Sequence, residues 1–150
     1  MICQMGEATI YIVIGVPDMR VNGRTIFRME RVLKLGQVIL LYKYKDGTRY
    51  EGTYLNGKKN GKGQLNFIDE SKYIGEFLNN EITGIGEYYW NDGKIYKGEW
   101  KNNKMYGKGE TIWRDKKRYI GEYLDDKKHG HGIFEWGNGK VYEGGWANGK

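Results

Sequence analysis

The chain has 150 residues, which suffices for one domain with a modest core. It holds 24 glycines, one proline and 15% aromatic residues, and because disordered glycine-rich chains are poor in aromatic residues, this composition excludes disorder and indicates short strands joined by tight turns. The net charge of +6 is a mild basic excess that does not require a nucleic-acid partner.

The N-terminal region contains one apolar run that we do not expect to act as a signal peptide or a membrane span. The apolar run Ala8–Val16 lacks a basic start and is too short to cross a bilayer as a helix, so we expect no transmembrane segment. Cys3 is the only cysteine and cannot form an internal disulfide. A fold that needs no oxidising compartment predicts a cytoplasmic location.

Residues 1–49 contain several β-rich runs. These are Thr9–Val16, Thr25–Arg28, Arg31–Leu35 and Val38–Tyr44. We interpret the region as a strand-bearing cap that ends in a degenerate repeat, rather than as a separate domain, because repeat arrays need their first edge covered.

From residue 50 onward the sequence repeats with a period of 23 residues. A tyrosine opens each unit, a glycine follows two residues later, and another aromatic residue two positions after that; a G-x-G step and a closing aromatic complete the unit. The opening tyrosines are Tyr50, Tyr73, Tyr96, Tyr119 and Tyr142, and the closing aromatics are Phe67, Trp90, Trp113 and Trp136. The array therefore consists of units 50–72, 73–95, 96–118, 119–141 and a partial unit 142–150.

Each unit has the pattern of one β-hairpin. Tyr-x-Gly-x-aromatic has period two, so these three residues share one face of a strand. Turn sequences such as Asn91-Asp92-Gly93-Lys94 and Asn56-Gly57 join the strands. Successive hairpins predict an all-β fold, an elongated single-layer antiparallel meander of roughly ten to thirteen strands, without helices in residues 50–150.

The pattern Tyr-x-Gly-x-(Trp/Tyr/Phe)-x-x-(Gly/Asn)-x-x-x-Gly-x-Gly resembles the MORN (membrane occupation and recognition nexus) repeat family over residues 50–150. This chain departs from it at two kinds of turn, and there we expect looser turns in intact hairpins. Asn80, Asn103 and Asp126 replace one glycine, and Glu70 and Lys116 replace another. The resemblance implies interaction modules of cytoskeletal, ciliary and membrane-junction proteins, or repeats that precede catalytic domains.

Nothing in the sequence has the pattern of an active site. His129 and His131 are the only histidines and have no cysteine cluster or third imidazole to complete a metal site. Ser71 is the sole serine, and the G-x-G steps lack the helix that a dinucleotide loop requires. We predict neither catalysis nor a cofactor nor a metal within these residues.

Lysines near matching turns form the first candidate site. They are Lys58, Lys59, Lys62, Lys101, Lys104, Lys108, Lys127 and Lys128, with Glu81 interrupting the row. A strip of this kind can contact anionic lipid headgroups, whereas edge lysines also serve solubility.

Rings on the aromatic face form the second candidate site, for protein partners. They are Tyr54, Phe77, Trp100, Tyr123 and Trp146, and we expect some of the face to stay accessible as a groove. The alternative is that the rings only cover their own glycines and form the core.

These observations favour a non-catalytic scaffold that binds protein partners at the cytoplasmic face of membranes or at the cytoskeleton, with homodimerisation as a further option. One alternative is a phosphoinositide- or anionic-lipid-binding module. Another is the N-terminal regulatory part of a longer phosphatidylinositol-phosphate kinase or histone-lysine methyltransferase, since the array stops midway through a unit. We expect no nucleic-acid partner.

Overall fold

The structure is a computed structural model that describes residues 10–12, 19–21, 24–34, 37–44 and 46–150, with side chains described from residue 43 onward. Within these ranges the chain forms thirteen β-strands and no helix. The strands are β1 (Ile10–Ile12), β2 (Met19–Val21), β3 (Arg24–Lys34), β4 (Gln37–Tyr44), β5 (Arg49–Leu55), β6 (Lys58–Asn66), β7 (Lys72–Leu78), β8 (Glu81–Tyr89), β9 (Ile95–Lys101), β10 (Lys104–Ile112), β11 (Arg118–Leu124), β12 (Lys127–Glu135) and β13 (Val141–Trp146).

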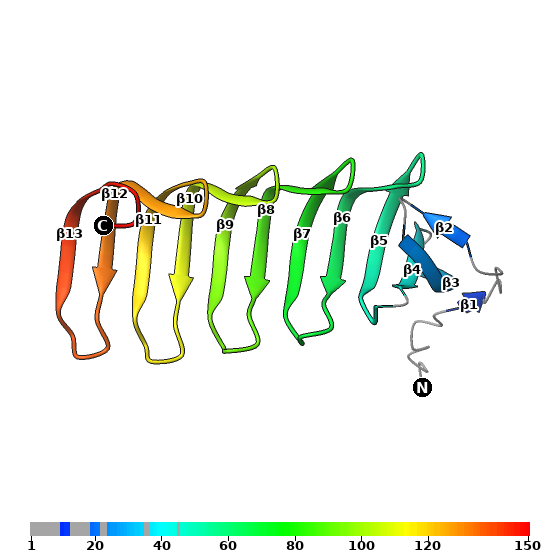
Figure 1. Ribbon diagram of the computed structural model, residues 1–150, viewed down its shortest axis with the longest axis horizontal. Coiled ribbons are helices and arrows are strands. Elements are labelled where there is room, and N and C mark those ends of the chain that lie inside the picture. The colour runs from blue at the N-terminus through cyan, green and yellow to red at the C-terminus, as the bar shows by residue number, and fades with distance from the viewer. Residues whose placement is uncertain (1–9, 13–18, 22–23, 35–36, 45) are drawn as a thin grey trace, which may run out of the picture.

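All described strands belong to one antiparallel sheet. From β3 to β13 each strand pairs with the next in sequence, while β1 and β2 both pair with β3 (Figure 1). Each 23-residue unit forms one hairpin, and the hairpins follow one another along the long axis of the molecule. The predicted single-layer meander of tandem hairpins is therefore confirmed.

The N-terminal strands differ from the runs marked in the sequence. Thr25–Arg28 and Arg31–Leu35 were expected as two strands, but residues between them pair with β4, with Met29 opposite Tyr42, and β3 is continuous through Lys34. Strand β2 was not predicted. Because β4 pairs with β5, the sheet runs from this region into the array. That this region acts as a cap and contains a degenerate repeat stays a prediction. Cys3 lies outside the described residues.

Two-residue turns along the upper edge of Figure 1 hold one repeat to the next. Asn102 and Asn103 have φ of 51° and 65°, the left-handed pair that a tight hairpin turn requires. The Asn103 Oδ1 accepts a bond from Ile82 N at 2.8 Å, and Asn103 N donates to Ile82 O at 3.0 Å. Asn80 and Asp126 bind the preceding repeat in the same way. The expectation of looser turns is wrong here, because the side chain supplies an acceptor that glycine lacks.

Longer turns along the lower edge of Figure 1 also keep one geometry in every repeat. Gly93 N donates to Trp90 O at 3.1 Å with φ of 87°, and Lys116 N donates to Trp113 O at 3.0 Å with φ of 67°. Glu70 has φ of 68°. These turns are not looser either, since the non-glycine residue adopts the left-handed conformation and the closing hydrogen bond forms.

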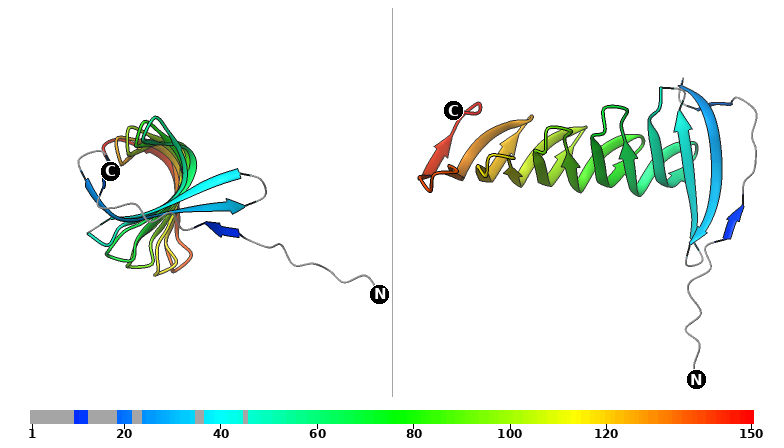
Figure 2. Two further views of the ribbon diagram at one scale, coloured as in Figure 1. Left: turned by 90° about the vertical axis from the view of Figure 1, so that its right-hand side faces the viewer. Right: turned by 90° about the horizontal axis from the view of Figure 1, so that it is seen from below.

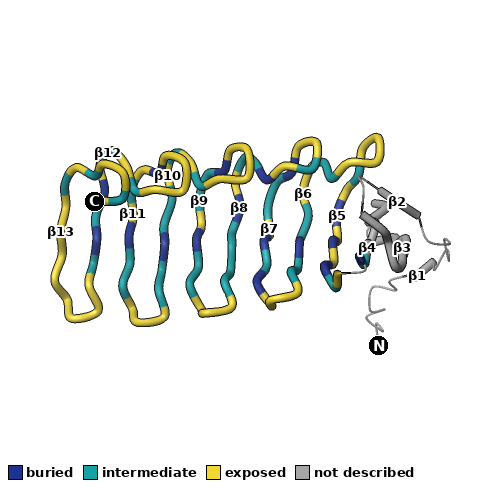
Figure 3. The backbone as a smooth tube through the Cα atoms, in the orientation of Figure 1, coloured by how far each residue is buried: buried dark blue, intermediate teal, exposed yellow. Residues whose placement is uncertain are grey.

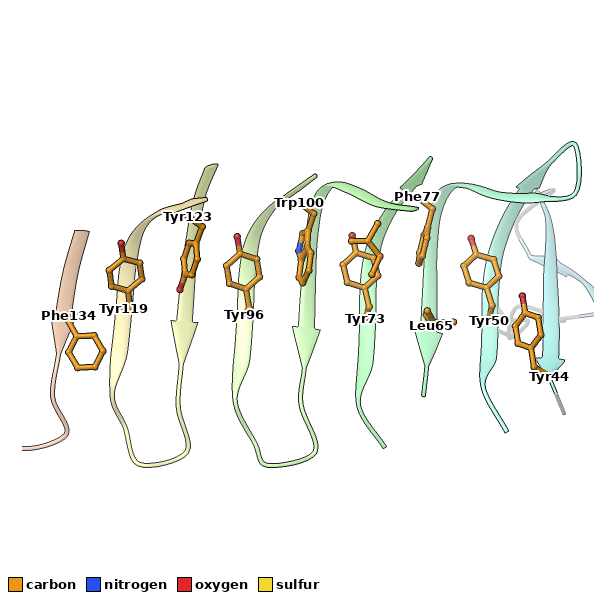
Figure 4. Close-up of a cluster of buried hydrophobic side chains, with 11 residues drawn as sticks. Tyr44, Tyr50, Leu65, Tyr73, Phe77, Tyr96, Trp100, Tyr119, Tyr123 and Phe134 are labelled. Carbon is orange, nitrogen blue, oxygen red and sulfur yellow. The ribbon is translucent and has the colours of Figure 1, made fainter. Parts of the chain in front are cut away.

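The core is a row of tyrosines lying over a row of glycines. Tyr50, Tyr73, Tyr96 and Tyr119 are fully buried (Figure 4). The Tyr96 hydroxyl donates to Glu99 O at 2.9 Å, so the ring lies across Gly98 and Gly109, which face each other in the register. A Cβ on Gly109 would lie 2.5 Å from Cε2 of Tyr96. The bare backbone of the glycines therefore creates the space that the rings fill.

The sheet encloses this row by curling. Seen along its long axis, it forms a trough (Figure 2), and buried positions recur in every strand from β5 to β12 (Figure 3). Since all described strands share one sheet, no second layer buries the tyrosines, and their burial requires that they lie on the inner, concave face. Side chains alternate between the two faces along each strand, so the residues next to these tyrosines in sequence point to the outer face.

Candidate interaction surfaces

The five rings proposed for partner binding belong mainly to the core. Phe77, Trp100 and Tyr123 are 3%, 6% and 5% exposed, because each packs edge-on against the opening tyrosines; Trp100 lies 5.1 Å from Tyr96 between ring centroids. These three rings present no free face, and the expectation of accessibility is wrong for them. Tyr54 and Trp146 are half-buried.

A second line of rings on the concave face lies closer to the longer turns. Phe67, Trp90 and Trp113 are half-buried and Trp136 is 39% exposed. They pack against rings of the core layer, as in the 4.6 Å centroid distance between Trp136 and Phe134. The sequence analysis missed them as a site, although the closing-aromatic column of the repeat was the signal that marks them.

Six of the eight candidate lysines lie away from the concave face. Exposed side chains beside the two-residue turns are Lys58, Lys101, Lys104 and Lys127. Lys104 pairs with Asp125 at 3.3 Å, and Lys101 Nζ lies 4.9 Å from the Tyr106 ring centroid. Exposed lysines farther along the strands, Lys62 and Lys108, stand opposite glutamates in the register. The outer-face charges thus lie among carboxylates.

The other two lysines lie on the concave face and do not belong to the edge strip. Lys59 and Lys128 stand directly opposite Tyr54 and Tyr123 in the register. Their Nζ atoms lie over rings, 5.5 Å from the Tyr50 centroid for Lys59 and 4.2 Å from that of Phe134 for Lys128. The expectation of one lysine row is therefore wrong at these two positions. An even number of strand positions separates residues 59 and 128 from the inward-facing glycines, so their side chains point to the same face as the glycines do.

The described part of the chain contains no cluster of metal-ligating side chains. It has no group of three or more His, Cys, Asp or Glu side chains that could hold a metal ion, and Ser71 is buried against Asp69 and Tyr88. His131 Nε2 lies 3.8 Å from Glu143 Oε1, and both side chains are largely exposed. Within the same ranges, no helix has the length and apolarity to cross a membrane.

Comparison with protein families settles what the array is. The family model described as the MORN repeat matches residues 50–72, 73–95, 96–118, 119–141 and 142–150. The chain belongs to the MORN repeat family. The MORN repeat is a non-catalytic repeat and in general a module for interaction with proteins or membranes.

Curated relatives resemble only part of this MORN chain. Alsin from Homo sapiens and alsin from Pan troglodytes are each 36% identical to it over 70 residues, which is 45% of the chain and 4% of alsin. The chain thus corresponds to a small fraction of the length of these relatives.

Proposed function

We propose that the chain is a MORN-type scaffold whose concave face binds a segment of a protein partner. The observation that carries the proposal is the line of rings on that face formed by the half-buried Phe67, Trp90 and Trp113 and the exposed Trp136. Tryptophan and tyrosine with one face open are the residues that contribute most when a partner docks. All described strands form one sheet, so a partner could reach the face between the two rows of turns.

Anionic-lipid binding is the second candidate function. Exposed lysines beside the two-residue turns support it, since these turns share one edge of the sheet. Each lysine near an anionic surface contributes about 1 kcal/mol. Nearby Glu81 and Asp125 weaken this edge, and we therefore rank the lipid function second.

Localisation and context are further parts of the proposal. We place the chain in the cytoplasm, at the membrane periphery or the cytoskeleton, and we keep homodimerisation as one form of partner binding. An array attached to the catalytic part of a longer phosphatidylinositol-phosphate kinase or histone-lysine methyltransferase would use the same concave face to bind its partner.

A matched pair of variants tests the scaffold proposal. Peptides selected from a random-peptide display library on the chain should lose binding to Met105→Glu, which places a negative charge on the concave face, and keep it on Ile85→Glu, which makes the same change on the outer face. Equal loss or equal retention in the two variants would refute concave-face binding.

Vesicles separate the second candidate function from the first. Co-sedimentation with vesicles containing phosphatidylinositol phosphates, at about physiological salt, should leave the chain in solution if the scaffold proposal is right. Pelleting that is abolished when Lys58, Lys101, Lys104 and Lys127 are changed to glutamate would favour the lipid module instead.

A further inference from the structure

Lys128 places a charge at a repeat position that holds an apolar side chain in two of the four complete units. The residue opposite the second aromatic of each unit is Lys59, Ile82, Met105 and Lys128 in turn. Ile82 is buried and Met105 packs against the core. The position accepts an unbranched apolar chain, so the fold itself does not require a lysine at residue 128.

The ammonium group of Lys128 lies within a cage of four rings. Its Nζ is 4.2 Å from the ring centroid of Phe134 and 4.4 Å from that of Trp146. Tyr119 and Trp113 complete the cage at 5.3 Å and 5.5 Å. Ring faces attract a cation, and they hold this one on the concave face.

Within the part of the chain that the structure describes, no opposite charge accompanies this ammonium group. Burial lowers the pKa of Lys128, and among the described residues no carboxylate lies within ion-pair distance of its Nζ. The side chain is half-buried and lies beside the half-buried Trp113 and Trp146. A partly desolvated, unneutralised cation on an open aromatic face attracts an anion more strongly than a lysine in water does.

Stability does not account for this lysine. Contacts with ring faces contribute about 0.5–2 kcal/mol, but desolvation of the charge opposes them. A methionine would fill the same space without that cost, as Met105 does at the equivalent position. The charge therefore points to a ligand that supplies the missing negative group.

We propose that Lys128 is the anchor for a carboxylate on a partner's acidic peptide segment, an aspartate or glutamate flanked by apolar residues that pack on the neighbouring tryptophans. This inference rests on the proposed function of the concave face and names the chemistry of the segment bound there. The carboxylate accepts a charge-assisted hydrogen bond from Nζ while the rings exclude water around the pair.

Peptides selected on the full chain test the anchor. They should contain Asp or Glu beside apolar residues, and Lys128→Met should weaken their binding about tenfold or more. Lys127→Met is the matched control: it removes the same charge from the adjacent, exposed residue and should leave binding unchanged. Lys128→Glu should regain binding when the acidic residue of the peptide is replaced by lysine.

The outcomes separate failure of the anchor from failure of the scaffold. Peptides that bind Lys128→Met as tightly as the original chain, yet not Met105→Glu, would overturn the anchor and leave concave-face binding intact. Peptides indifferent to both changes would overturn both. If the original chain binds no peptide but pellets with phosphatidylinositol-phosphate vesicles, and Lys128→Met does not pellet, the site binds lipid phosphate and the proposal is overturned. Circular dichroism of each variant confirms that it is folded.

Discussion

Replacing Gly109 by alanine tests the packing of tyrosine over glycine. The new Cβ would lie 2.5 Å from Cε2 and 2.6 Å from Cζ of Tyr96, well inside contact distance. The ring cannot move aside freely, since its hydroxyl donates to Glu99 O at 2.9 Å and its edges pack against Trp100 and Tyr123 at centroid distances of 5.1 Å. The substitution must therefore displace the ring or separate the strands.

The expected loss follows from what the displaced ring gives up. Overpacking costs about 1–3 kcal/mol, and removal of a fully buried ring costs about 3–5 kcal/mol. Tyr96 is completely buried, so we expect Gly109→Ala to lower the free energy of unfolding by about 3 kcal/mol. With a urea dependence of about 1–3 kcal/mol per molar, the unfolding midpoint falls by about 1 M or more.

A second glycine provides the control. Gly145 in β13 has no atom within 4 Å of a built Cβ and does not adopt a left-handed φ. Gly145→Ala should therefore leave the midpoint unchanged or raise it slightly. Urea unfolding followed by tryptophan fluorescence compares the two variants. Equal midpoints for Gly109→Ala and Gly145→Ala would refute the role assigned to the glycine row.

Three further predictions concern other parts of the array. Asn103→Gly keeps the left-handed turn but leaves Ile82 N without its side-chain acceptor, so thermal denaturation should show a loss of about 1 kcal/mol, and Asn103→Ala should lose more because alanine strains the turn. Burial raises the pKa of Tyr119 to about 12 and also raises that of Tyr96. In the unfolded chain these tyrosines ionise near pH 10, so the stability that they contribute is complete below about pH 10 and falls as the pH rises towards 12. Urea unfolding midpoints measured at increasing pH would show this fall. Lys128→Met should raise the urea unfolding midpoint near neutral pH, because it removes a desolvated charge. Burial lowers the pKa of Lys128 and does not penalise the neutral amine, so this gain should shrink as the pH approaches the ordinary pKa of lysine. A gain independent of pH would contradict this reasoning.

The hairpin array could be predicted because the repeat determines both the length of each strand and the face of the sheet to which each side chain points. Tyr96, Gly98 and Trp100 alternate by two and recur at a fixed period, which leaves one arrangement of strands. The inward position of Lys128 was predictable in the same way, by counting in twos back from Gly132, but a lysine next to a turn is easily assigned to the loop.

Burial of the rings could not be predicted from the alternation. The face to which a side chain points is a local property of the strand. The burial of Trp100 instead depends on how far the whole sheet curls. Irregular pairing adds to the curl, as where the register between β9 and β10 shifts and Gly107 has φ of 57°. The Asn103 side chain likewise bonds a residue 21 positions earlier, a contact between repeats that no short motif encodes.

The indole N–H resonances of the five tryptophans test the central claim most directly. Addition of a selected acidic peptide should shift the signals of Trp90, Trp113 and Trp136 on the open part of the concave face. The signal of Trp100, which is buried and donates to Gly86 O at 3.1 Å, should move little. Unchanged indole signals together with a shifted methyl signal of Ile85 on the outer face would contradict the account.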